Sequence, residues 1–243
     1  MTSSGPATLS APVARILPTR PELLATLRAM RPATWGRRAA RAQAEQPLTL
    51  ALLAVLLVTT IWLGQSSNPT HVLRSTSTNI ANLTHSPITA LVGSALFLDG
   101  GGWVKYALAL FVTLGLIERR RGTLTALSVF ASAHIIVTMV TEGGVWIGIR
   151  AGLVRHAERF QLDVGVSYGL WSCAFAAIAL TPRRWRGPLV VLLSALVLVP
   201  LAQDVDMTTI GHVLSALVGL AWWPTLLRGI DRRAGGEVPY INR

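Results

Sequence analysis

Two polar side chains stand out within apolar stretches of the chain, a serine and a histidine. Ser167 lies in the stretch 163–180 and His212 lies in the stretch 209–227. Polar groups inside membrane-spanning helices are costly, so each of them requires an explanation. A serine hydroxyl beside an imidazole is the minimal arrangement for nucleophilic catalysis, because the imidazole accepts the hydroxyl proton and returns it to the leaving group. The pair predicts a hydrolase with Ser167 as nucleophile and His212 as base and then acid.

Small residues recur at intervals of four around both side chains. Each set forms one smooth helix face, which lets two helix backbones approach closely. If the two faces meet, Ser167 and His212 come within hydrogen-bond reach of about 3 Å. The alternative is a packing role alone, with the serine bonded to its own backbone and the histidine a satisfied polar residue. The small residues are Gly165 and Gly169 in the first stretch, and Gly211, Ser215 and Gly219 in the second.

The composition indicates which elements must position this pair. The chain has 243 residues, of which 51% are hydrophobic and 14% charged, with a net charge of +11. So apolar a chain is not disordered, and a nucleic-acid binder of this charge is rarely half apolar. The single cysteine, Cys173, cannot form a disulfide framework, and we interpret it as inert core. We expect no metal and no cofactor, and the class that remains is an all-α membrane protein.

Six apolar stretches are predicted to cross the membrane. The segment 65–102 forms a long, membrane-associated first loop, and its apolar part at 86–98 is too short to cross. We expect that part to dip into the membrane edge or to pack against the bundle, and seven spans would result if it crossed. Residues 142–161 are expected to form a mixed loop. The predicted spans are 47–64, 103–117, 124–141, 163–180, 188–203 and 209–227.

The basic residues predict the orientation of these spans. With both termini in the cytoplasm, 17 of the 22 basic residues lie on the inner side, as the positive-inside rule requires. The domains are then a basic cytoplasmic arm at 1–46, a six-helix membrane domain at 47–227 and a cytoplasmic tail at 228–243. The location expected for this topology is the cell membrane.

Several motifs, taken in order, resemble those of the rhomboid superfamily. Residues 96–122 are similar to its Gly-Gly-Trp turn and to the Glu-Arg-Arg-x-Gly end of its second helix. Residues 165–167 resemble the Gly-x-Ser element of its fourth helix, and residues 211–219 resemble the histidine element of its sixth. The matching positions are Gly101, Gly102, Trp103, Glu118, Arg119, Arg120, Gly122, Gly165, Ser167, Gly211, His212 and Gly219.

The resemblance implies a six-helix intramembrane serine protease with a Ser167–His212 dyad. Its partners would be the lipid bilayer and a membrane-anchored protein substrate, which it would cleave near the outer face. Glu118, Arg119 and Arg120 would serve as structural anchors at a helix end, and nucleic acid is not an expected partner.

Three positions depart from the rhomboid pattern. Lys105 and Ala109 stand where the family carries a histidine and an asparagine that help to stabilise the oxyanion, and Tyr168 stands where a glycine usually follows the nucleophile. Losing one oxyanion donor typically costs about 10²–10³ in rate. Lys105, Gly165 and Tyr168 are the candidates for supporting the oxyanion in their place. The alternative is a catalytically inactive rhomboid-like protein that binds or escorts transmembrane helices.

Overall fold

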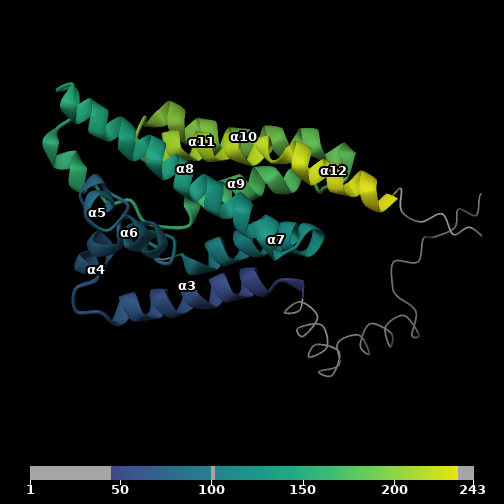
Figure 1. The fold of residues 1–243 in the computed structure, drawn as a ribbon, viewed down its shortest axis with the longest axis horizontal. Helices are drawn as coiled ribbons and strands as arrows, with labels where there is room; N and C mark the ends of the chain where they lie inside the picture. Colours follow the sequence, from purple (N-terminus) through teal and green to yellow (C-terminus); the bar gives the residue numbers. More distant parts are fainter. Residues whose placement is uncertain (1–44, 100–101, 235–243) are drawn as a thin grey trace, which may run out of the picture. The chain divides into compact units, whose positions relative to one another are not determined.

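The computed structural model describes residues 45–99 and 102–234, with side chains up to residue 228, and these residues are helical with no strand among them (Figure 1). The expected arm at 1–46 and Gly101 therefore fall almost entirely outside the described residues. The helices are α3 (Pro47–Gln65), α4 (Pro69–Thr76), α5 (Ile80–His85), α6 (Pro87–Ser94), α7 (Trp103–Arg121), α8 (Thr123–Arg150), the 3₁₀-helix η1 (His156–Phe160), α9 (Ser167–Ile178), α10 (Arg183–Gln203), α11 (Met207–Ala221) and α12 (Trp223–Ala234).

Four helical stretches of the described part are long and apolar enough to cross a membrane. They are Pro47–Gln65, Thr123–Arg150, Arg183–Gln203 and Met207–Arg228. Their outward faces expose large aliphatic side chains, for example Val58 at 64% and Val191 at 69%. Such faces are stable against lipid and costly in water. The all-helical membrane fold predicted from the sequence is confirmed.

Helix α9 is the central element of the bundle. It packs against α7, α8, α10 and α11, and its contact with α11 is the most extensive (Figure 1). Nine of its 12 residues are buried, and most of them are small, as in the run Ser172–Ala177. Small side chains allow several neighbouring helices to approach one backbone closely. Cys173 is fully buried there, as expected.

The first loop contains three short helices, α4, α5 and α6. Proline occupies the first turn of α4 and of α6, where its missing N–H leaves no bond unmade. Asn68 and Asn79 cap α4 and α5 by accepting hydrogen bonds from the His71 and Asn82 amides. The apolar part at 86–98 contains only the eight-residue α6, about 12 Å long, which is too short to cross.

Two predicted boundaries were wrong, the end of the third span and the end of the last span. Helix α8 continues to Arg150, so the first nine residues of the loop expected at 142–161 are helical. The Glu142 side chain is buried against the bundle, and Gly143 and Gly144 remain within the helix. The last span is interrupted at Trp222, and its second half, α12, extends past the expected boundary at 227.

At the end of α7, Glu118 ties three helices together. Its side chain is 2% exposed and accepts hydrogen bonds from the amides of Leu48 and Thr49, both at 2.8 Å. The hydroxyls of Thr49 and Thr123 donate to the same carboxylate at 2.7 and 2.9 Å. A negative charge at the N-terminus of α3 satisfies amides that have no partner within the helix.

The neighbouring arginines cap carbonyls at the same end of the bundle. Arg120 donates to the Leu180 carbonyl at 3.3 Å, just beyond α9. Arg121 donates to the Leu226 carbonyl, whereas Arg119 is exposed. We refer to this region as the Glu118 end of the bundle.

Candidate active site at the start of helix α9

A tight turn positions Ser167 as the first residue of α9. Gly165 has a φ of +122°, a conformation that side chains rarely allow, and its amide donates to the Ser94 carbonyl at 2.7 Å. The expected helical start at Asp163 was therefore wrong, because residues 163–166 form the turn. The Gly-x-Ser element works here as a bend followed by a helix N-terminus. We refer to this region, opposite the Glu118 end, as the Ser167 end.

Asp163 fastens this turn to the first loop. Its Oδ2 accepts a hydrogen bond from the Thr78 hydroxyl at 2.9 Å, and its carbonyl accepts one from the Thr78 amide at 2.9 Å. Its own amide donates to the Ser77 hydroxyl at 2.8 Å. Burial raises the pKa of Asp163 above its ordinary value, while the hydrogen bond from Thr78 opposes this shift.

The small residues on α9 and on α11 do not all contact the helix expected from the sequence. On α11, Gly211 lies under the ring of Tyr168, and Gly219 lies against the backbone carbonyl of Ser172. Tyr168 precedes Ser172 on α9, and their contacts Gly211 and Gly219 follow the same order on α11, so the two helices run in the same direction. Gly169, in contrast, contacts Phe130 of α8, so it does not form the expected face toward α11.

Ser215 completes the α11 face without facing a polar partner across the helix contact. It is fully buried, and its hydroxyl donates to the Gly211 carbonyl one turn earlier at 2.7 Å. A serine bonded in this way behaves as a small packing residue.

The His212 ring is enclosed by aromatic residues from the first turn and a half of α9. Its centroid lies 6.1 Å from that of Tyr168, in an edge-on arrangement, and 5.7 Å from that of Trp171. Its Nε2 is buried and makes no hydrogen bond within the part of the chain that the structure describes. A buried polar atom without a partner is unusual in a folded protein.

Ser167 shares the helix face that carries Trp171. Residues four apart lie one above the other on a helix, so Ser167 is on the side of α9 that faces His212. Its side chain is half-buried and, among the described residues, makes no hydrogen bond to His212. The Tyr168 ring occupies the helix contact beside them.

The first turn of α9 offers backbone donors beside Ser167. The amides of residues 167–169 make no hydrogen bond within the described chain, and Val166 provides no side-chain cap. Such free amides can bind an oxyanion, and the helix dipole favours negative charge there.

Lys105, the expected substitute donor, makes no hydrogen bond to Ser167 in the part of the chain that the structure describes. It is exposed, and its Nζ lies 5.1 Å from the centroid of its neighbour Tyr106. Ala109, one turn further along α7, has no polar group. Neither residue therefore contributes a donor beside Ser167 in this structure.

Other residues around the Ser167 end are also relevant, and sequence reasoning missed two of them, Glu142 and Trp171. His134 of α8 is buried, and its Nε2 lies 2.9 Å from the Leu91 carbonyl and 3.2 Å from the Ser94 hydroxyl. Glu142 was assigned to a loop but is buried in α8. Trp171 was not singled out, although its position four residues after Ser167 is a signal that could have identified it.

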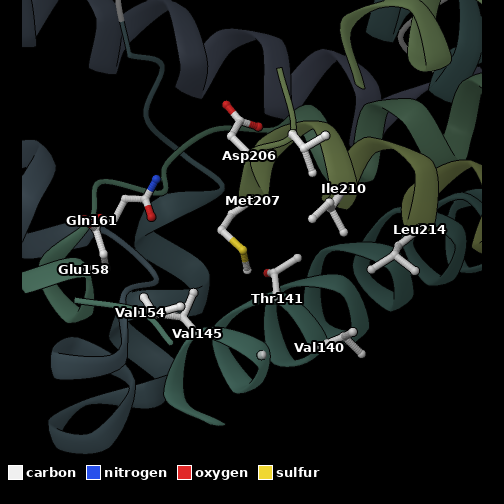
Figure 2. Close-up of a pocket in the computed structure, with 12 residues that line it drawn as sticks. Val140, Thr141, Val145, Val154, Glu158, Gln161, Asp206, Met207, Ile210 and Leu214 are labelled. Atoms are coloured by element: carbon white, nitrogen blue, oxygen red, sulfur yellow. The ribbon is translucent and has the colours of Figure 1, made fainter. Parts of the chain in front are cut away.

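A cavity of about 400 Å³ opens nearby, between α8, the start of α11 and the segment 154–161 (Figure 2). Thr141, Met207 and Ile210 line it together with two carboxylates, Glu158 and Asp206. Ser167 and His212 do not line it, so it lies on another side of α11 from the candidate dyad.

Together these features define a multi-pass, all-helical membrane protein with a serine and a histidine on adjacent helices. A family model described as rhomboid-like protein matches residues 42–233, and the chain belongs to this rhomboid-like family. The comparisons with curated proteins and with solved structures found no match.

Proposed function

We propose that the chain is an intramembrane serine hydrolase that cleaves membrane-anchored proteins with a Ser167–His212 dyad. One observation carries the proposal: the His212 ring is held against the first turns of α9 while its buried Nε2 lacks a partner in the described chain. In this proposal the hydroxyl of Ser167, on the same face as Trp171, supplies that partner after a side-chain rotation.

In this mechanism His212 accepts the hydroxyl proton as Ser167 attacks the scissile carbonyl. The free amides at the start of α9 stabilise the oxyanion, in place of the donors absent at Lys105 and Ala109. His212 then protonates the leaving amine, and water attacks the acyl-enzyme with His212 again as base. Gly165 maintains the turn that keeps these amides free.

The proposed topology has six spans with both termini in the cytoplasm. Four are the long apolar helices, and α7 and α9 supply the other two. Helix α9 has 12 residues and is about 18 Å long, so it starts below the membrane surface. Ser167 would then lie within the membrane near the outer face, where it meets membrane-anchored substrates.

The second candidate is an inactive relative that binds transmembrane helices. Tyr168, in place of glycine, is the observation that favours it, because the ring fills the contact between α9 and α11 beside the dyad. Such a protein would use the same helices to hold a client without cleaving it.

Labelling with a fluorophosphonate distinguishes the two functions. We expect the wild type to be labelled, and Ser167→Ala and His212→Ala each to abolish labelling. Ser128→Ala is the matched control, because Ser128 is exposed on α8 and donates only to the Leu124 carbonyl. Labelling that persists in both dyad variants, or a wild type that is never labelled, contradicts the hydrolase.

A further inference from the structure

A basic pocket lies at the Ser167 end, separate from the dyad. It has a volume of about 240 Å³ and lies between α5, the last turn of α8 and η1. Arg150, His156 and Arg159 line it together with Trp146 and the hydroxyl-bearing Thr84. Because a water molecule takes about 30 Å³, the pocket can hold a small anion and several waters.

The two arginines of the pocket have no acidic partner, unlike their neighbour. Within the described chain the only ion pair joins Arg155 to Glu158, at 2.5 Å. The guanidinium of Arg150 lies 4.9 Å from the centroid of the Trp146 ring. The Nε of Arg159 is buried and has no hydrogen-bond partner in the region described. Two guanidinium groups without acidic partners around one pocket favour the binding of an anion. The planar set of N–H donors of arginine fits the oxygens of a phosphate group in particular.

The surroundings of the pocket indicate where such an anion would come from. Arg150 ends a 28-residue membrane-spanning helix, and Trp146 one turn earlier is 48% exposed, as is usual for tryptophan at a membrane interface. Leu153, between Arg150 and His156 in the sequence, and Phe160, directly after Arg159, also expose most of their apolar surface. A phosphate group whose lipid tails cover neighbouring apolar side chains fits this position.

We infer that Arg150 and Arg159 bind the phosphate of an anionic membrane lipid in this pocket. A lipid headgroup and soluble phosphate would present the same phosphate oxygens to the two arginines. The apolar surface beside the pocket favours the lipid over the soluble ion, because it can contact the lipid tails. Binding would tie η1, which precedes the turn at Gly165, to the end of α8. It involves neither Ser167 nor His212, so the site can exist whether or not the dyad is catalytic.

Lipid retention by the detergent-purified full-length chain tests this site. The probes are phosphatidylglycerol and phosphatidylcholine, and native mass spectrometry measures how much of each lipid stays bound to the protein. We expect phosphatidylglycerol to bind more tightly, and Arg150→Gln and Arg159→Gln each to weaken it about tenfold, as expected for one lost charge-assisted hydrogen bond. Arg155→Gln removes the same charge from the same segment outside the pocket, and should change binding less than about threefold.

Further variants and a soluble probe identify the source of the phosphate. Arg159→Lys, which keeps the charge but loses the planar fork, should weaken binding less than Arg159→Gln. Equal binding of the two lipids, or an equal loss in Arg155→Gln, would overturn the proposal. Inorganic phosphate that binds with the same arginine dependence and without preference between lipids would show that a soluble anion, not a lipid, occupies the pocket.

Discussion

The Glu118 end and the Ser167 end of the bundle differ in whether their buried polar groups are hydrogen-bonded. At the Glu118 end, one carboxylate on α7 accepts four hydrogen bonds from residues of α3 and α8. At the Ser167 end, the His212 Nε2 and the first amides of α9 have no partner within the described chain. A buried group whose bonds are complete stabilises a fold, whereas one whose bonds are open has capacity left for a ligand.

The difference separates residues that the family resemblance groups together. The Glu-Arg-Arg run and the Gly-x-Ser and Gly-His elements all match the rhomboid pattern, but their surroundings differ. Glu118 is joined to the helix starts around it, while the His212 ring lies against the aromatic rings of Tyr168 and Trp171. The comparison therefore predicts large stability effects at the Glu118 end and large activity effects at the Ser167 end.

The largest stability effect is expected for Glu118→Ala. It leaves the Leu48 and Thr49 amides and two hydroxyls without their acceptor, and should lower the free energy of unfolding by about 3–5 kcal/mol. Unfolding in detergent with increasing SDS measures this change. Glu158→Ala is the control, because its surface ion pair with Arg155 should contribute less than about 1 kcal/mol. Equal effects of the two variants would erase the contrast between the ends.

The next effect concerns the contact between α9 and α11. A Cβ at Gly219 would lie 2.3 Å from the Ser172 carbonyl oxygen, which belongs to the backbone and cannot turn aside. We expect Gly219→Ala to destabilise the protein by about 2–3 kcal/mol. Gly143→Ala meets nothing within 4 Å and should be neutral or slightly stabilising, by up to about 1 kcal/mol. The same SDS titration compares the two, and a tolerated Gly219→Ala would contradict the close approach of these helices.

The sequence predicted the membrane class and much of the helix order because long apolar runs and clustered arginines are strong, local signals. It did not predict the end of α8, because a glutamate after an apolar run is typical of a loop, and the tertiary contacts that bury Glu142 are not visible in the sequence. It also placed the start of α9 four residues early, since the turn at Gly165 depends on a bond to Ser94 far away in the sequence.

The candidate site shows the same limit. Ser167 and His212 could be singled out from their types and their apolar context, and the small spacing on α11 corresponds to a real close contact. The helix that packs against Gly169 could not be predicted. The spacing shows that small side chains share one helix face, but it does not show which neighbouring helix contacts that face. The surroundings of His212 depend on Tyr168 and Trp171 crossing from a different helix.

A smaller, functional effect is expected for Trp171. If its ring holds the imidazole beside Ser167, Trp171→Ala should slow fluorophosphonate labelling about tenfold, equivalent to roughly 1.4 kcal/mol in the barrier. Trp171→Phe should restore part of the rate because it keeps an aromatic ring. Trp185→Ala, at an exposed position on α10, is the control. A rate unchanged in Trp171→Ala would show that the aromatic enclosure does not position His212.

The smallest effect concerns Asp163 and the pH dependence of stability. Burial raises its folded pKa above the unfolded value of 3.8, so the fold favours the protonated acid. That contribution is complete below the unfolded pKa and is lost as the pH rises through the folded pKa. Asp163→Asn should therefore gain stability relative to the wild type with rising pH, by less than about 1 kcal/mol because the bond from Thr78 offsets part of the burial cost. SDS unfolding as a function of pH measures the difference, with the exposed Asp204→Asn as control. A wild type that gains on Asp163→Asn as the pH rises would mean that the fold stabilises the charged form of the Asp163 carboxylate, and the contrast between the two ends would then be confined to His212 and the amides of α9.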